Sequence, residues 1–190
     1  MKNLKLSLLL LLASIFTFSC SDDDNPEAVN EEEVITTLRL TLTPQGGGTA
    51  IVLQSQDLDG DGPNPPVITP MSAQLSANTT YDAIVQVFNE LETPADNITL
   101  EVAEEDDEHQ FFYEFTGAAN SSASYTDADA DGNPVGITTT ISSGVVSTGN
   151  ALTVTLIHEP QKDAAGVSSG DITNAGGETD VEVTFSYDVN

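Results

Sequence analysis

Residues 180–189 read Asp-Val-Glu-Val-Thr-Phe-Ser-Tyr-Asp-Val, a strict alternation of apolar and polar side chains. Alternation with a period of two residues is typical of a strand that buries one face and exposes the other to solvent. Residues 34–43 alternate in the same way and place Leu38, Leu40 and Leu42 on one face. These two segments predict that the chain folds into antiparallel β-sheets.

Further strand-like runs lie between these two segments. They occupy residues 49–55, 81–91, 110–116, 136–141 and 150–158. The run 81–91 carries apolar residues on both parities, which predicts a central strand buried on both faces. Residues 45–48, Gln-Gly-Gly-Gly, predict the turn of a hairpin between the first two strands. Residues 98–102 alternate like a strand, but Asp96 or Asn97 is suited to cap a helix, and we expect a short helix or turn there.

Short, threonine-rich strands separated by loops rich in glycine, proline and asparagine favour one fold class. It is a β-sandwich of immunoglobulin-like type, with a small β-barrel as the alternative. The loops at 56–73, 117–135 and 160–179 are long for a compact domain, and loops of such length are usually functional or mobile. We therefore predict a single, mainly β domain over residues 34–190.

The N-terminal residues are typical of a cleaved secretion signal. Lys2 and Lys5 form a short positive region, and residues 6–18 form an apolar stretch of 13 residues. This stretch is shorter than the roughly 20 residues that span a bilayer. The sequence Thr-Phe-Ser-Cys that ends at Cys20 resembles a bacterial lipobox, which implies cleavage before this cysteine and attachment of lipid to its sulfur. Cys20 is the only cysteine, so no internal disulfide can form. We expect residues 1–19 to be a lipoprotein signal peptide.

Residues 20–33 predict a disordered tether, because they are mostly acidic and polar. The run Ser21-Asp22-Asp23-Asp24 resembles the acidic export signal that directs some Gram-negative lipoproteins to the outer face of the outer membrane. We therefore expect a lipid-anchored outer-membrane protein that is exposed on the cell surface. The periplasmic face of the membrane is the alternative.

Charge restricts the partners. The chain has 31 acidic residues and a formal net charge of −27, and beyond the signal peptide its only basic residues are Arg39 and Lys162. Nucleic acid is excluded as a partner because phosphate binding requires a basic surface. An anionic membrane surface would also repel the protein, so we expect membrane attachment through the lipid alone. Cations, glycans and envelope proteins with basic surfaces fit this charge.

Three further stretches join the lipobox in a resemblance that covers most of the chain. They are Glu108-His109-Gln110-Phe111-Phe112-Tyr113, Gly132-Asn133-Pro134-Val135-Gly136 and Gly176-Gly177-Glu178-Thr179-Asp180. With them the chain resembles short acidic Gram-negative envelope lipoproteins labelled "type 1 periplasmic binding fold superfamily protein". That label implies a two-lobed α/β binding protein with parallel sheets. The residues themselves lack an alternating strand–helix–strand pattern and predict the β-sandwich instead.

Two loops share the pattern D-x-D-x-D-G. The carboxylates are those of Asp57, Asp59 and Asp61 in the first loop and of Asp127, Asp129 and Asp131 in the second. In an EF-hand this spacing points alternate carboxylates at one Ca²⁺. Ile68 and Thr138 stand where an EF-hand has its glutamate, so neither loop is an EF-hand. The loops are either looser Ca²⁺ sites of a β domain or ordinary solvated turns.

His109 and His158 are the only histidines. Each lies near the end of a predicted strand, on the apolar parity. If the two strand ends converge, both imidazoles together with Glu108 or Glu159 would suit a transition metal. The alternative is a pair of hydrogen-bonded histidines at the edge of a core.

No catalytic residues are predicted. Residues 166–170, Gly-Val-Ser-Ser-Gly, match the nucleophile elbow of α/β-hydrolases, but they lie in a polar segment without the strand and helix that an elbow requires. We expect a non-enzymatic ligand-binding or protein-interaction module, with a metal-handling lipoprotein as the alternative. Exposed Tyr113 or Tyr125 beside the loops would favour glycan or protein binding.

The lipid anchor has a direct test. Cells that express the wild-type chain should incorporate labelled palmitate into it, because the lipobox supplies the acceptor sulfur at Cys20. The Cys20→Ala variant should incorporate none and should be released from the membrane fraction. Equal labelling of both proteins would contradict the prediction.

Overall fold

A computed structural model describes residues 33–60 and 62–190. The predicted signal peptide, Cys20, the tether up to residue 32 and Asp61 lie outside the described residues. Within those residues, no helix is both long and apolar enough to cross a membrane.

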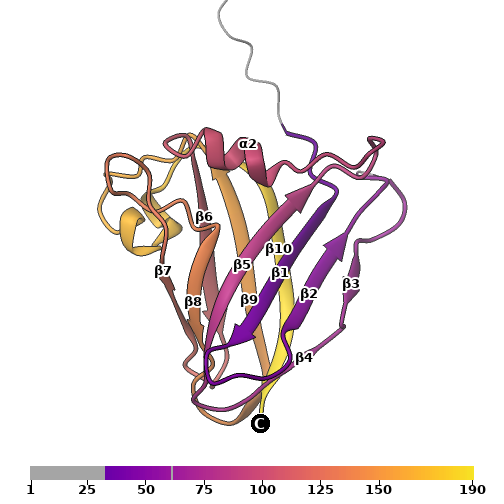
Figure 1. The fold of residues 1–190 in the computed structure, drawn as a ribbon, viewed down its shortest axis with the longest axis vertical. Helices are drawn as coiled ribbons and strands as arrows, with labels where there is room; N and C mark the ends of the chain where they lie inside the picture. Colours follow the sequence, from indigo (N-terminus) through magenta and orange to yellow (C-terminus); the bar gives the residue numbers. More distant parts are fainter. Residues whose placement is uncertain (1–32, 61) are drawn as a thin grey trace, which may run out of the picture. The chain divides into compact units, whose positions relative to one another are not determined.

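Two β-sheets face each other (Figure 1). The first has six strands, in the order β3 (Val67–Thr69), β2 (Ile51–Gln56), β1 (Thr37–Pro44), β5 (Thr80–Phe88), β8 (Thr138–Ser142) and β7 (Ser122–Tyr125). The second has four, in the order β4 (Ala73–Leu75), β10 (Glu178–Val189), β9 (Ser147–His158) and β6 (His109–Thr116). Neighbouring strands are antiparallel except for β4 and β10.

This arrangement confirms the predicted mainly β sandwich. The alternative of a single closed sheet is not what the described residues form, since the strands divide into two sheets with open edges. The two-lobed α/β fold implied by the resemblance is likewise wrong. The predicted hairpin is present as well, because β1 pairs antiparallel with β2 in a continuous register.

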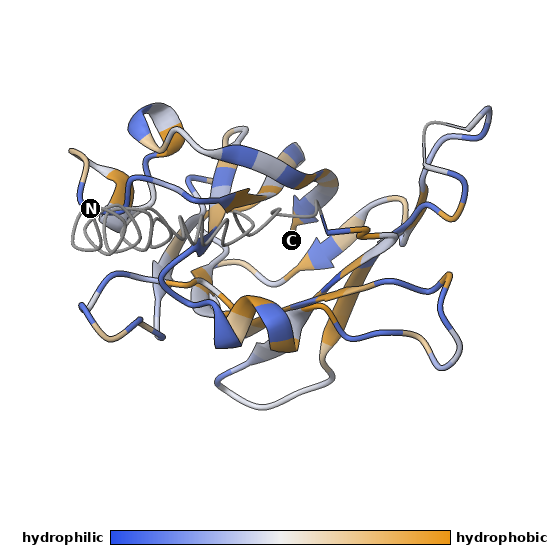
Figure 2. Cartoon of the chain, turned by 90° about the horizontal axis from the view of Figure 1, so that it is seen from above, coloured by the Kyte–Doolittle hydropathy of each residue, from blue (hydrophilic) through white to orange (hydrophobic). Residues whose placement is uncertain are grey.

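The core lies between the two sheets. Leu38, Leu40 and Leu42 of β1 are at most 1% exposed and belong to one hydrophobic cluster with Phe185 and Tyr187 of β10. The alternating patterns at both ends of the domain thus supply the two facing sides of this core. Apolar residues follow the strands, whereas the loops at the periphery are mostly hydrophilic (Figure 2).

The prediction for the run 81–91 is wrong in one respect. β5 is a central strand, but only one of its faces is buried: Val85 is 0% exposed, whereas Ile84 is 48% exposed. Antiparallel sheets commonly leave one face in contact with solvent. The apolar residues on both parities therefore do not mark a strand covered on both sides.

The three shortest strands were not predicted. β3 and β7 lie within the predicted loops 56–73 and 117–135, and β4 begins where the first of these loops ends. All three form edges of the two sheets. Three or four residues are too few to show a period, so a neighbouring strand is needed to define them.

The predicted short helix is α2 (Thr99–Glu104), which lies across one end of the sandwich (Figure 1). Neither Asp96 nor Asn97 caps it: the N-cap residue is Ile98, and no side chain caps this end. Thr99 instead connects the helix to β5, since its Oγ1 accepts a hydrogen bond of 2.8 Å from the Val87 N–H.

The segment that follows β9 covers the outer face of the four-stranded sheet. It contains two short 3₁₀ helices, η1 (Val167–Ser169) and η2 (Ile172–Asn174). Val167 and Ala175 pack with Phe112 and Ile157 in a second, smaller hydrophobic cluster. Gln110 Nε2 also donates a hydrogen bond of 2.9 Å to the Val167 carbonyl. This predicted long loop is therefore docked on the sheet.

A pair of neighbouring residues tests the one-sided burial of β5. Val85→Ala should lower the free energy of unfolding by about 2 kcal/mol, because it removes two buried methyl groups from a closely packed core. Ile84→Ala should cost less than half of that, because its side chain is half exposed. Urea denaturation of both variants measures the difference, and equal losses would contradict the one-sided burial.

Candidate metal centre

The two histidines meet at the end of the four-stranded sheet. β6 begins at His109 and β9 ends at His158, and these residues are direct partners in the antiparallel pairing of the two strands. Residues directly opposite each other in such a pair share one face of the sheet. The imidazole centroids lie 4.5 Å apart, and the ring planes meet at 70°. The convergence that the sequence left open is therefore present.

Asp180 joins the two histidines because of a β-bulge. The register of β10 against β9 shifts between Thr179 and Val181, which makes Asp180 the extra residue of the bulge. Bulges of this kind redirect a side chain. Asp180 Oδ2 lies 4.0 Å from His109 Nε2, and its side chain is 5% exposed. His109, His158 and Asp180 each offer a ligand atom, and these three atoms lie within 4.8 Å of one another.

Glu33 approaches the same imidazole from the segment before β1. Its Oε1 lies 3.6 Å from His109 Nε2, and its side chain is 10% exposed. Burial raises the pKa of the Glu33 carboxyl to about 7, with further contributions from the negative charges of Asp180, Glu101 and Glu105. Two poorly solvated carboxylates, those of Glu33 and Asp180, therefore lie close to His109 Nε2, and this arrangement favours the binding of a cation.

His109 has the tautomer of a metal ligand. Its Nδ1 lies 3.2 Å from the Glu105 carbonyl oxygen. Since a carbonyl can only accept, Nδ1 carries a hydrogen, and Nε2 is the ring nitrogen that faces Glu33 and Asp180. Nε2 has no hydrogen-bond partner in the described part of the chain, and the residue is 0% exposed. Metal-ligating histidines usually donate their other ring N–H to such a carbonyl.

Three of the side chains lie close enough to approach one small ion. Ligand atoms about 2.0–2.1 Å from a tetrahedral Zn²⁺ lie roughly 3.3 Å from one another. The ligand atoms of His109, His158 and Asp180 lie within 4.8 Å of one another, so these side chains would have to move together by up to about 1.5 Å to hold such an ion. Glu33 Oε1 lies 3.6 Å from His109 Nε2 but belongs to a separate potential ligand group with His109 and Glu105. Two imidazoles and two carboxylates are a donor set that Zn²⁺ and similar transition ions accept.

The predicted glutamate partners lie on the solvent side of His158. Glu108 Oε2 is 4.0 Å from His158 Nε2, and Glu108, Glu159 and His158 form a second potential ligand group. Both glutamates are exposed. Sequence reasoning thus named the two histidines and their exposed neighbours but missed Glu33 and Asp180, the buried carboxylates. Only the bulge in β10 and the path of the chain before β1 bring those two into the site.

In the first D-x-D-x-D-G loop, the described carboxylates accept hydrogen bonds from within the loop. Asp57 Oδ1 accepts from the backbone N–H of Asp59 and of Gly60, at 3.2 and 2.9 Å. Asp59 Oδ2 accepts from the Asn64 side chain at 2.7 Å.

The second loop uses its carboxylates in the same way. Asp127 accepts from two backbone N–H groups, those of Gly136 and Thr138, both at 2.8 Å. Asp129 Oδ1 accepts from the backbone N–H of Asn133 and of Asp131. None of the potential ligand groups among residues 33–60 and 62–190 includes an aspartate of either loop.

A buried cation already accompanies Asp129. Lys162 is 6% exposed, and its Nζ lies 3.0 Å from Asp129 Oδ2 and also donates to the Asp106 carbonyl. Burial raises the pKa of the Asp129 carboxyl, but the hydrogen bonds and the charge of Lys162 outweigh this and hold it below its ordinary value. Lys162 therefore occupies the position next to Asp129 that a metal ion would otherwise need.

The two tyrosines and the serine singled out from the sequence do not form a functional site. Tyr113 is buried, and its hydroxyl donates to the Gly136 carbonyl at 2.7 Å. Tyr125 is half-buried and donates to the Phe111 carbonyl at 2.8 Å. Neither ring is the exposed aromatic that would favour glycan binding. Ser168 lies in η1, which is not an α-helix that follows a buried strand, as a nucleophile elbow would require.

Comparisons of the chain with protein-family models, with curated proteins and with solved structures found no match.

The pair of Lys162 and Asp129 should carry stability. Lys162→Met should lower the free energy of unfolding by about 3–5 kcal/mol, because it leaves a buried carboxylate without its cation. The double variant Lys162→Met/Asp129→Asn should recover part of this loss. Since the folded-state pKa of Asp129 is lowered, its contribution is present above the unfolded-state pKa and disappears as the pH falls through the folded-state value. Urea denaturation at neutral and acidic pH tests both statements, and a pH-independent loss would contradict them.

Proposed function

We propose that this chain is a lipid-anchored envelope protein whose β-sandwich holds one divalent transition-metal ion, best Zn²⁺, through His109, His158, Asp180 and Glu33. The signal peptide, Cys20 and the acidic run after it support the envelope location. The four side chains at the end of the sandwich support the metal.

The observation that carries the proposal is the buried Nε2 of His109. This nitrogen faces Glu33 Oε1 and Asp180 Oδ2, and the other ring nitrogen is already hydrogen-bonded to the Glu105 carbonyl. Two carboxylates close to one buried imidazole nitrogen form an environment suited to a cation.

A metal ion explains more of the arrangement than a proton does. A metal ion would use every neighbouring donor, because Asp180 and His158 offer ligand atoms within 4.8 Å of that of His109. Hard cations such as Ca²⁺ and Mg²⁺ prefer oxygen ligands, whereas imidazole nitrogen is suited to transition ions. The donor set therefore favours Zn²⁺ over the Ca²⁺ that the two aspartate loops suggested.

The proposed centre is closed, which favours a structural role over a catalytic one. Zinc sites that perform chemistry keep one coordination position open for water or substrate, whereas structural sites use four protein ligands. His109, His158 and Asp180 would supply three ligands, Glu33 beside His109 Nε2 would supply the fourth, and His109 is fully buried. The ion would join the segment before β1 to the ends of β6, β9 and β10. It would thereby stabilise the end of the domain at which the described residues begin.

Metal binding can be measured on the mature protein purified in detergent and stripped with EDTA. One equivalent of Zn²⁺ should bind, and a hundredfold excess over the dissociation constant should stabilise the fold by about 2.7 kcal/mol, which corresponds to roughly 5–10 °C in Tm. Mg²⁺ and Ca²⁺ at equal ionic strength should have a much smaller effect. Co²⁺ should produce the visible absorption bands of a tetrahedral site.

Conservative variants separate the buried centre from general acidity. Asp180→Asn and His158→Gln should each weaken Zn²⁺ binding by about 100-fold or more. The matched control Asp82→Asn removes an exposed charge from β5 and should leave binding unchanged. Circular dichroism verifies that the variants fold. If Zn²⁺ binds Asp180→Asn and the wild type equally, or if Zn²⁺ and Mg²⁺ shift Tm by the same amount, the proposal is wrong.

A further inference from the structure

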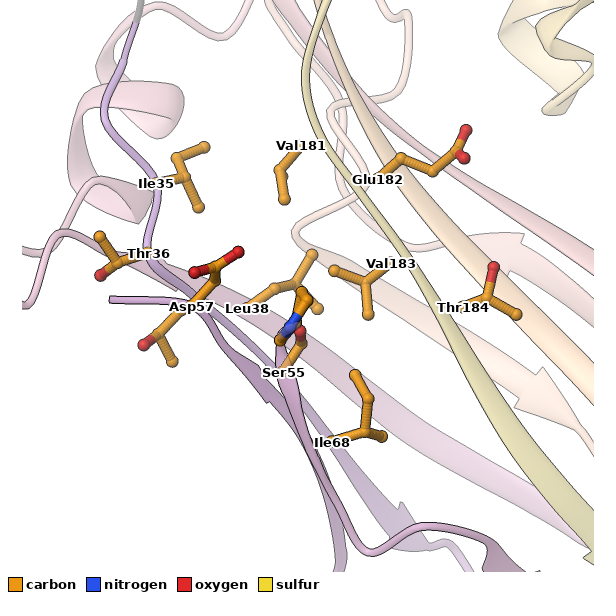
Figure 3. A pocket seen from close by; sticks show the side chains of 12 residues that line it. Ile35, Thr36, Leu38, Ser55, Asp57, Ile68, Val181, Glu182, Val183 and Thr184 are labelled. Atoms are coloured by element: carbon orange, nitrogen blue, oxygen red, sulfur yellow. The ribbon is translucent and has the colours of Figure 1, made fainter. Parts of the chain in front are cut away.

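A second site lies on the open side of the sandwich, between β10 and the strands β1, β2 and β3. We call it the lateral groove. Its volume is about 230 Å³, and the residues that line it include Ile35, Leu38, Ser55, Ile68, Val181 and Val183. Figure 3 shows Val181 and Val183 directed toward Leu38 and Ile68, whereas Glu182 and Thr184 lie on the other side of β10.

One edge of β10 is only partly paired beside this groove. β9 pairs with β10 along almost its whole length, from Glu178 to Val189. On the opposite edge, β4 pairs with β10 only over Tyr187–Val189. In the described part of the chain no strand pairs with this edge over residues 181–186. Unpaired backbone N–H and C=O groups on a regular strand are a template for another strand.

Natural edge strands are usually protected by proline, by lysine or by short length. β10 is 12 residues long and contains neither residue type, and its register shifts lie outside residues 181–186, so this stretch has none of these protections. An extended chain along residues 181–186 would cover about 20 Å of edge. Alternate side chains of that chain would enter the groove beside Leu38, Ile68 and Val183. This combination of an open edge and an adjacent apolar groove is the arrangement used for strand addition.

The charges around the groove indicate which kind of segment can bind there. The charged residues at the groove are Asp57 and, on the outer side of the same stretch of β10, Glu182; neither lysine nor arginine lines it. A second copy of this chain would bring like charges together, because the formal net charge is −27. Residues 20–32 of the chain itself are acidic and contain no lysine or arginine. An extended segment with apolar residues on one parity and basic residues on the other complements both the groove and its rim.

We propose that the lateral groove receives an extended, basic segment of a partner protein, which adds to β10 as a parallel or antiparallel strand. This site is separate from the metal centre in function, although Asp180 and Val181 are neighbours in sequence. Backbone hydrogen bonds to residues 181–186 would supply affinity, and the groove would select the apolar side chains.

The probe is a synthetic peptide with blocked termini and the sequence Lys-Val-Thr-Val-Lys-Val-Thr-Lys, labelled for fluorescence anisotropy. It should bind the mature protein in detergent, and added salt should weaken the binding because the rim contributes charge. A peptide of the same composition with its valines grouped together should bind at least about tenfold more weakly, because it cannot place alternate side chains in the groove. A version with glutamate in place of lysine should also bind at least about tenfold more weakly.

Pairs of variants test whether the peptide binds in the groove. Val181→Trp should fill it and reduce peptide affinity by about tenfold or more, whereas Ile84→Trp, which adds the same ring to the exposed face of β5, should not. Glu182→Gln should weaken binding and reduce its salt dependence, and the control Glu114→Gln on β6 should do neither. If circular dichroism shows that Val181→Trp is unfolded, Ile68→Trp blocks the groove from the opposite wall.

Three results would overturn the proposal. The first is no binding of the alternating basic peptide, and the second is equal binding of this peptide to the groove-filled variant and to the Ile84→Trp control. The third is sedimentation of the wild type as a dimer that Val181→Trp dissociates, which would assign the groove to a second copy of this chain. Because the peptide test can be run with the metal removed, failure here is distinct from failure of the metal proposal.

Discussion

The pairing of β9 with both of its neighbours is the constraint on which the candidate site depends. β9 lies between β6 and β10, and its antiparallel register with β6 places His158 opposite His109. Its register with β10 shifts at the bulge, where Asp180 is inserted, and again between Tyr187 and Val189. Because the same ladder also aligns the apolar residues of the core, the ligand geometry cannot shift without disturbing the packing between the sheets.

The scarcity of basic residues makes each cation in the fold important. Arg39 is used on the outer face of β1, where its guanidinium lies 5.2 Å from the Phe88 ring centre and its Nε donates to Gln54. Lys162 is buried against Asp129. The carboxylates of Glu33 and Asp180 lie beside His109 instead. A strongly acidic domain of this kind gains more from one divalent cation than a balanced one would.

The proposed metal centre and the lateral groove use the same two segments of the chain. Glu33 and Ile35 precede β1, and Asp180 and Val181 begin the regular part of β10. One residue of each pair belongs to the proposed centre and the other lines the groove. An ion that holds these segments together would therefore also fix the walls of the groove at one end. Metal binding and the shape of the groove would be coupled because Glu33 is only two residues from Ile35, and Asp180 is directly followed by Val181.

Local pattern was sufficient for the fold class, for the hairpin, for α2 and for the strands that end the chain, because each depends on a period visible within one segment. It also identified both histidines. It failed where the outcome depends on a distant partner: the one-sided burial of β5, the short edge strands and the docking of the segment after β9. Asp180 is the clearest case, since its parity in the sequence places it with the exposed Glu182. Only the register shift between β9 and β10, which leaves Asp180 as the extra residue, turns it inward, and such a bulge is a property of two paired strands that neither segment contains alone.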